Sequence, residues 1–239
     1  YMPRFAGDIL PEQEIGRALS LADKLDNLAA TFLRGLIPTG SQDPFALRRQ
    51  TIGAVNILTD GKIHWDIRRG IEAALALLPG DEETKKTVLS QIEDFFRQRI
   101  KAIMLDEGIA YDIIDAVLAG PVDDIYALFL KARSMAESQL KGEAELRQAV
   151  TRLANITKGK TGGKVDPSLF TEDVEKKLQD AFEAVSAKAL PLFASYEYGK
   201  ALPALKELTA PINDYLDNVM VMVDDEAVKN NRISQLLAT

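Results

Sequence analysis

Apolar residues recur at three- and four-residue steps along nearly the whole chain, and this periodicity constrains its fold more than any other feature. From Ile15 to Phe32, for example, the spacing of Leu19, Leu25 and Leu28 places them on one helical face. Patterns that alternate apolar and polar residues, which are typical of half-buried strands, are nearly absent. The sequence therefore predicts an all-α, multi-helical fold.

One short segment departs from this pattern. Residues 219–223 (Val-Met-Val-Met-Val) are apolar on every side, which suits either a short strand or a fully buried helix. Because the surrounding segments read as helical, we expect these residues to end a buried helix over 212–223.

Glycine, proline and capping residues divide the chain into segments. Asp43 followed by Pro44 predicts a helix start with Asp43 as the N-cap, and the acidic residues from Asp81 predict another start. A basic Gly-rich loop is expected over 158–164, with a helical restart at Asp166-Pro167. The remaining expected helices cover 15–32, 67–78, 111–119, 123–139, 143–156, 182–193, 203–208 and 225–237.

The length and composition are those of a folded chain. A length of 239 residues suits one or two domains, and a hydrophobic content of 46% excludes wholesale disorder. Pro79-Gly80-Asp81 is the best candidate for a boundary. We therefore predict one domain over 1–80 and a second over 81–239.

The charge balance limits the partners that this chain can attract. It carries 29 Lys and Arg against 36 Asp and Glu, a formal net charge of −7. Such a chain has no pervasive basic field, so a contact with nucleic acid must come from a local patch. No apolar run approaches the ~20 residues that span a bilayer, and we expect neither a membrane nor DNA as a partner.

Several kinds of catalytic site are excluded by composition. The chain has no cysteine, which removes disulfides, thiolate zinc sites and cysteine nucleophiles. It has one histidine, His64, with no partner visible nearby in the sequence, so we interpret His64 as a packing or surface residue. The absence of cysteine fits a reducing cytoplasm. The first residue is Tyr1 and no signal-peptide pattern follows, which suggests a piece of a longer protein.

Three short motifs allow either a functional interpretation or an interpretation as ordinary surface residues. Gly159-Lys160-Thr161 imitates the end of a phosphate-binding loop, but a helix precedes it where a strand is required, so we reject that motif. Asp23 and Asp26 share a helical face and suit a divalent ion, although such pairs are more often solvated. The Arg48-Arg49 doublet suits phosphate binding, or simply a solvated face.

Several segments in a fixed order resemble the β subunit of the bacterial heterotetrameric glycyl-tRNA synthetase. They are Tyr-Met-Pro-Arg-Phe-Ala-Gly-Asp at 1–8, Ala-Asp-Lys-Leu-Asp at 22–26, Pro-Thr-Gly-Ser-Gln-Asp-Pro-Phe-Ala-Leu-Arg-Arg at 38–49, Asp-Glu-Gly at 106–108, Asp-Ile-Ile-Asp-Ala-Val-Leu at 112–118, Arg-Leu-Ala-Asn-Ile at 152–156, and Tyr-Leu-Asp-Asn-Val-Met-Val-Met-Val-Asp-Asp-Glu at 215–226 with Asn-Arg at 231–232. The resemblance covers essentially the whole chain.

The resemblance implies an arrangement that composition does not reveal. Residues 1–80 then correspond to the end of an HD-like helical domain, and residues 81–239 to a helical-bundle anticodon-binding domain similar to that of arginyl-tRNA synthetase. The family implies an α2β2 assembly in the cytoplasm, in which the α subunit uses ATP and Mg²⁺ to activate glycine and the β subunit recognises tRNA(Gly). This portion is expected to bind no cofactor itself and to be non-catalytic as part of glycine–tRNA ligase.

The expected RNA contacts are polar residues that suit phosphates, bases or stacking. They are Arg48, Arg49, Arg97, Arg99, Lys101, Arg152, Asn155, Asn231 and Arg232. Asn155 and Asn231 are equally interpretable as capping or core residues, and Tyr111 as a core residue rather than a stacking platform.

Two other functions stay open at this point. The resemblance maps Asp23 onto the last metal ligand of HD-type phosphohydrolases, but a single carboxylate makes no metal site, so we assign none. A fragment of such a metal-dependent phosphohydrolase is one alternative. A purely structural scaffold that holds subunits together is the other.

Overall fold

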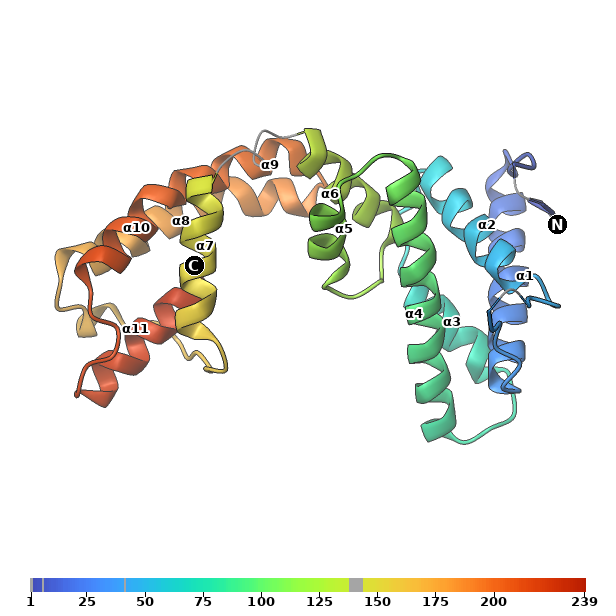
Figure 1. Cartoon of the computed structure of the whole chain (residues 1–239), viewed down its shortest axis with the longest axis horizontal. Helices are drawn as coiled ribbons and strands as arrows, with labels where there is room; N and C mark the ends of the chain where they lie inside the picture. The colour runs from blue at the N-terminus through green and yellow to red at the C-terminus, as the bar shows by residue number, and fades with distance from the viewer. Residues whose placement is uncertain (1, 6, 41, 138–143) are drawn as a thin grey trace. The chain divides into compact units, whose positions relative to one another are not determined.

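The computed structural model describes residues 2–5, 7–40, 42–137 and 144–239, and its regular structure there is helical (Figure 1). The described residues contain isolated β-bridges but no strand, so the predicted all-α fold is confirmed. Of the expected helix ends, Gln139 and Glu143 lie outside the described residues. The same holds for Tyr1, Ala6 and Ser41 of the resembling segments.

The chain forms two compact units, Tyr1–Arg133 and Ser134–Thr239, here called unit 1 and unit 2. This division lies later than the boundary predicted at 80/81, because the long helix after Asp81 packs onto the helices before it. Phe95 of that helix meets Phe32 edge-on, with ring centroids 5.2 Å apart. The predicted assignment of 1–80 and 81–239 to two domain types stays a prediction.

Unit 1 is built around a long helix. It contains α1 (Glu14–Leu33), α2 (Leu47–Asp60), α3 (Ile67–Ala76), α4 (Glu82–Asp106), α5 (Tyr111–Leu118) and the greater part of α6 (Ile125–Glu137), whose last residues, from Ser134 on, belong to unit 2. Helices α1, α2 and α3 contact α4, and α5 packs on α4 as well. The core where they meet contains fully buried apolar side chains such as Leu28, Ile57 and Phe96.

Local capping explains where several of these helices begin. The helix start predicted at Asp81 is confirmed, and Asp81 caps α4 by accepting a hydrogen bond from the Thr84 backbone N–H over 2.8 Å. The start of α2 differs from the prediction, since the helix begins at Leu47 rather than at Pro44. The predicted N-cap was therefore wrong, since Ala46 occupies that position, but the Asp43 carboxylate still accepts the backbone N–H groups of Leu47 and Arg48 at 2.7 and 3.0 Å across an intervening turn.

Unit 2 is a second helical bundle. It contains α7 (Ala144–Thr157), the 3₁₀ turn η2 (Pro167–Leu169), α8 (Asp173–Ala194), α9 (Tyr198–Leu205), η3 (Lys206–Leu208), α10 (Thr209–Asn218) and α11 (Glu226–Ala238). Helix α8 packs on α9 and α10, while α10 and α11 both contact α7. Tyr215, Leu178, Val185 and Ile212 belong to the apolar cluster inside this bundle.

The segment 219–223 is not the buried helix that the sequence predicts. Helix α10 ends at Asn218, and Val219 has extended backbone angles. Val219 and Val221 are buried, whereas Met220 and Met222 are exposed, which is the alternation of an extended chain. A contact from a distant residue holds it there, since Arg232 donates to the Met220 carbonyl at 2.8 Å.

None of the helices in the described part of the chain has the length and apolar character that crossing a membrane requires.

Candidate nucleic-acid interface

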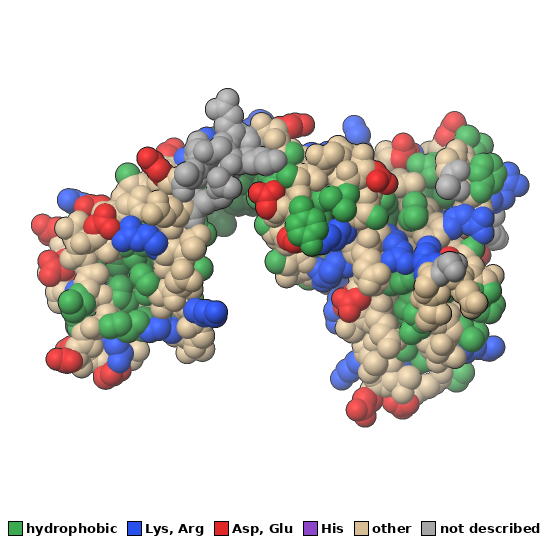
Figure 2. Space-filling view, in the orientation of Figure 1, with side chains coloured by type: hydrophobic (Ala, Val, Ile, Leu, Met, Phe, Trp, Pro, Cys, Tyr) green, Lys and Arg blue, Asp and Glu red, His purple; other side chains and the backbone are tan. Residues whose placement is uncertain are grey.

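Three arginines of unit 1 make up what we name the α2–α4 arginine cluster (Arg48, Arg49 and Arg99): Arg48 and Arg49 line one hollow, and the charge of Arg48 acts on Arg99. Arg48 and Arg49 lie in the first turn of α2, and Arg99 comes from the C-terminal half of α4, which packs against α2. Figure 2 shows Lys and Arg side chains gathered over this part of unit 1. The cluster therefore exists only because the fold joins two helices that are far apart in the sequence.

The charges of this cluster are only partly compensated. Arg99 packs over the Phe95 ring, with its guanidinium carbon 4.0 Å from the ring centroid. Burial lowers the pKa of Arg99, and the positive charge of Arg48 lowers it further, against an opposite effect of Asp43. Arg49 is exposed and forms no ion pair with any described residue. An anion placed here would relieve the repulsion between the guanidinium groups.

An aromatic side chain, Phe5, lines a hollow together with two arginines of the cluster. A cavity of about 460 Å³ is lined by Arg48 and Arg49 together with Phe5, Asn56 and Asp43, among others. Phe5 is 55% exposed, so its ring is available for stacking. Asn56 lies on α2 seven residues after Arg49, a spacing that places both on one helical face and that the sequence could have revealed. Phe5 comes from a distant segment, so no local pattern indicates that it lines the same hollow.

Arg97 and Lys101 lie on the same helix as Arg99 but have intramolecular partners. The Arg97 guanidinium donates to the backbone carbonyls of Leu118 and Gly120, the second at 3.0 Å, and so satisfies the end of α5. Lys101 forms an ion pair of 2.8 Å with Asp115 and lies 3.9 Å from the centre of the Tyr111 ring. Tyr111, expected in the core, is 59% exposed, so that expectation was wrong. RNA contacts by Arg97 and Lys101 stay predictions.

In unit 2 the predicted residues Arg152 and Asn155 lie on α7. Arg152 forms an ion pair of 2.6 Å with Asp217, which ties α7 to α10. Asn155 is exposed, on the same helix one turn further along. Of the two, Asn155 is therefore better placed to meet a ligand from solvent, and its contact with RNA stays a prediction.

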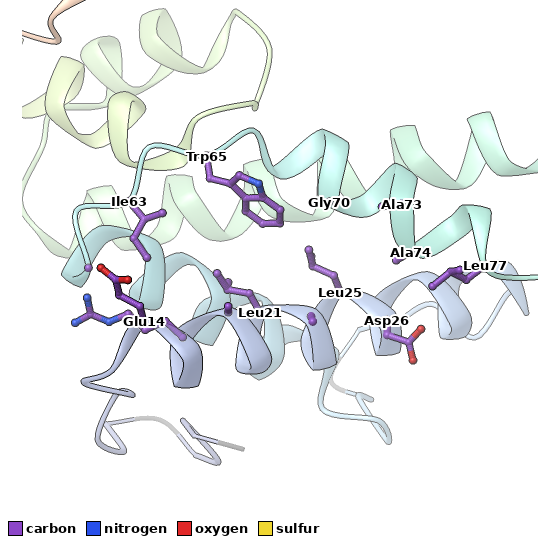
Figure 3. Close-up of a pocket in the computed structure, with 14 residues that line it drawn as sticks. Glu14, Leu21, Leu25, Asp26, Ile63, Trp65, Gly70, Ala73, Ala74 and Leu77 are labelled. Atoms are coloured by element: carbon purple, nitrogen blue, oxygen red, sulfur yellow. The ribbon is translucent and has the colours of Figure 1, made fainter.

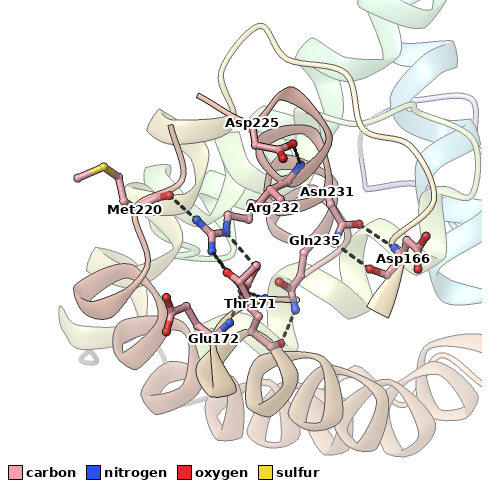
Figure 4. Close-up of polar contacts among 10 residues, drawn as sticks. Asp166, Thr171, Glu172, Met220, Asp225, Asn231, Arg232 and Gln235 are labelled. Atoms are coloured by element: carbon pink, nitrogen blue, oxygen red, sulfur yellow. Dashed lines mark hydrogen bonds and ion pairs between the residues drawn. The ribbon is translucent and has the colours of Figure 1, made fainter. Parts of the chain in front are cut away.

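Asn231 and Arg232 are buried inside unit 2 in the middle of α11 (Figure 4). The Asn231 side chain accepts the backbone N–H of Asp166 at 2.7 Å and donates to the Asp166 carbonyl at 3.0 Å. Arg232 forms an ion pair of 2.9 Å with Glu175 and donates to the Thr171 hydroxyl at 2.7 Å. These contacts give both residues a structural role, and a contact of either with RNA stays a prediction.

Glu175 is the acidic centre of this network. Its side chain is fully buried and accepts the backbone N–H groups of Thr171 and Glu172, each at 2.8 Å, besides the Arg232 guanidinium. Burial by itself raises the pKa of Glu175, but the hydrogen bonds from Arg232, Glu172 and Thr171 together with the Arg232 charge outweigh it. The net effect is a lowered pKa, so Glu175 stays ionised at neutral pH.

The other motifs singled out in the sequence have ordinary surroundings. His64 is an exposed residue, and its Nδ1 lies 2.8 Å from Asp124, a partner sixty positions away that no nearby sequence reveals. In the loop that imitates a phosphate-binding motif, Lys160 contacts the Met222 sulfur at 3.3 Å. Asp23 and Asp26 join no cluster of three or more metal-binding side chains among the described residues.

Comparisons with known proteins match both units of the chain. Residues 1–119 match the family described as glycyl-tRNA synthetase beta subunit, and residues 146–239 match the DALR anticodon binding domain. Glycine–tRNA ligase beta subunits are similar over 99% of this chain: that of Clostridioides difficile is 42% identical, that of Desulforamulus reducens 38% and that of Aeromonas salmonicida 41%. The chain spans 34%, 34% and 35% of the length of these curated relatives, respectively.

Proposed function

The chain belongs to the family of glycyl-tRNA synthetase β subunits, and we propose that it binds tRNA(Gly) and positions it for aminoacylation. One observation carries the proposal: the match to an anticodon binding domain covers 146–239, and the same residues fold as the helical bundle α7 to α11. Proteins read RNA sequence mostly at unpaired bases such as those of a loop, which is the kind of target that an anticodon offers.

The proposed contribution to the reaction is binding energy rather than chemistry. Contacts with a distant part of the tRNA help to place its acceptor end at an active site on another subunit, which lowers the entropic barrier to reaction. We propose that this partner is the α subunit of an α2β2 assembly in the cytoplasm, and that the α subunit uses ATP and Mg²⁺. The present chain then supplies no catalytic group and holds no cofactor.

The α2–α4 arginine cluster supplies the second part of the proposed interface. In its hollow the guanidinium groups of Arg48 and Arg49 accompany the exposed Phe5 ring, which suits a phosphate backbone beside an unpaired base. Because the chain has a net charge of −7, general attraction to RNA is poor, and such a local cluster is what binding requires. The phosphohydrolase alternative lacks such support, because the described residues contain no group of three or more side chains that could hold a metal ion.

The test measures tRNA(Gly) affinity as a function of salt for the chain and for the double variant Arg49→Gln with Arg99→Gln. Two lost phosphate contacts should lower the magnitude of the log–log salt slope by about 1.4–1.8, taking ~0.7–0.9 per phosphate. A matched control is available in α3, where Arg68 pairs with Glu72 and Glu93 and Arg69 pairs with Asp66. Arg68→Gln with Arg69→Gln should leave the slope unchanged.

A second measurement distinguishes the contribution of unit 1 to tRNA binding from that of unit 2. A tRNA with an altered anticodon should bind more weakly to the unchanged chain, and the α2–α4 variant should weaken cognate and altered tRNA by the same factor. Equal affinity for tRNA(Gly) and an unrelated RNA would contradict the proposed function. An unchanged salt slope in the folded α2–α4 variant would contradict the placement of the phosphate contacts in unit 1.

A further inference from the structure

Unit 1 contains an apolar groove that plays no part in the proposed RNA interface. It runs between α1 and α3, has a volume of about 770 Å³ and includes Leu21, Leu25, Trp65 and Leu77 in its lining (Figure 3). Figure 3 shows Trp65 and Leu25 pointing toward one another across it. Helices normally bury their apolar stripes against other elements, so an uncovered apolar groove of this kind suits the docking of another structural element.

The residues that line the groove are mostly of the types found in a protein core. Its floor and walls carry small residues, Ala18 and Ala22 from α1 and Gly70 and Ala73 from α3, which let another backbone approach closely. The Trp65 ring already packs closely against Gly70, since a Cβ at this position would lie 2.3 Å from the ring. Large apolar side chains remain exposed near it, notably Leu77 at 83%.

The charged groups at the groove show what the occupant must carry. Arg17 is already neutralised, because it donates to the Pro11 carbonyl at 2.8 Å and pairs with Asp60 at 3.1 Å. Glu14 and Asp26 also line the groove, and neither forms an ion pair within the described residues. They are twelve positions apart on α1, which corresponds to about 18 Å at 1.5 Å per residue. An occupant that complements this groove is an apolar helix of about three turns, with a Lys or Arg near each end to pair with Glu14 and Asp26.

We infer that this groove binds a helix of the same β-subunit polypeptide, from the part of the subunit's length that these 239 residues do not cover. The curated relatives are nearly three times as long as the chain, since it spans 34% of their length, so such a helix has ample sequence to come from. An apolar, small-residue lining is typical of permanently buried surfaces, whereas exchangeable interfaces are more polar. Covalent linkage also supplies a high effective concentration.

This inference rests on family membership and not on RNA binding, so the two proposals fail independently. The test places a single cysteine in the groove with Ala22→Cys and measures its alkylation by a maleimide. The chain has no cysteine of its own, so the introduced thiol is its single reactive site, and peptide mapping identifies it in the full-length β subunit. Ala102→Cys on the exposed surface of α4 is the matched control. Ala73→Cys reports from the opposite wall if Ala22→Cys does not fold.

The expected result is that the Ala22→Cys thiol reacts at least tenfold more slowly in the full-length β subunit than in the 239-residue chain, while Ala102→Cys reacts equally in both. Photo-cross-linking from the same position should then capture a peptide of the same polypeptide. Equal reactivity in the two proteins would overturn the inference. So would protection that appears only with added α subunit, only with added tRNA, or only as the concentration of the 239-residue chain rises, since each identifies a different occupant.

Discussion

Replacing Arg232 by methionine removes one half of the buried ion pair that holds unit 2 together. Methionine keeps the length and apolar stem of the side chain but removes the guanidinium. Four interactions are lost: two hydrogen bonds to the Glu175 carboxylate, one to the Thr171 hydroxyl and one to the Met220 carbonyl. The fully buried Glu175 carboxylate then loses the positive charge with which it is paired.

The size of the effect follows from that leftover charge. Removing one partner of a buried pair typically destabilises a protein by about 3–5 kcal/mol, because the remaining ion stays desolvated without compensation. The two backbone N–H groups that Glu175 accepts remain in place and moderate the loss. We therefore expect the free energy of unfolding of unit 2 to fall by about 3–4 kcal/mol in Arg232→Met.

The two units can be followed separately in one urea titration. The single tryptophan, Trp65, lies in unit 1, so its fluorescence reports the unfolding of unit 1 alone. Circular dichroism reports helix loss in both units. Arg232→Met should shift the dichroism transition of unit 2 to lower urea and leave the Trp65 transition in place. A loss below about 1 kcal/mol in unit 2 would refute the reasoning, as would an equal shift of the Trp65 transition.

A double variant and the pH dependence separate charge from packing. Arg232→Met combined with Glu175→Gln leaves no buried charge, so it should be less destabilised than the sum of the single variants. Because the pKa of Glu175 is lowered on folding, its contribution is present above its ordinary value of 4.5 and is lost as the pH falls through the folded value. The unchanged chain should therefore lose unit 2 stability in that acid window more steeply than the double variant.

Two further expectations concern unit 1, and both are measured through Trp65 fluorescence. Gly108 follows α4 with a φ of +79° and open space where a Cβ would be, so Gly108→Ala should cost about 1–2 kcal/mol from backbone conformation alone; an unchanged urea midpoint would contradict this. Burial lowers the pKa of Lys24, against an opposite effect of Asp23, so the stability of unit 1 should rise as the pH rises toward 10.5, and Lys24→Met should abolish that rise. A pH profile identical to that of the unchanged chain would contradict the second expectation.

The helices of unit 1 follow from the sequence because their signals are local. Apolar spacing and caps such as Asp81 act within one or two turns, so both can be identified without knowing the fold. The start of α2 was missed for a physical reason: Asp43 caps backbone groups four and five residues away across a turn, rather than the next turn of helix. In unit 2 the extended segment after α10 depends on Arg232, a contact that no local pattern reveals.

The candidate site could be predicted only as a list of residue types. Arg97, Arg99 and Lys101 look equivalent in the sequence, where each is a cation on one helix. The fold makes them different, because Arg97 meets the carbonyls that end α5 and Lys101 meets Asp115, whereas Arg99 meets Arg48. Which cations keep their charge available is decided by partners 14 to 51 positions away in the sequence, and only tertiary packing brings these partners close.

This dependence on tertiary packing has a consequence for how tRNA binding and stability are coupled in unit 1. Arg48 and Arg99 meet only while α2 packs on α4, and their mutual repulsion works against that packing. A bound phosphate removes the repulsion, so it must bind the folded unit more tightly than the unfolded one and stabilise it. If the proposed function is right, the Trp65 unfolding transition should therefore move to higher urea with tRNA(Gly), and the shift should shrink in Arg49→Gln with Arg99→Gln.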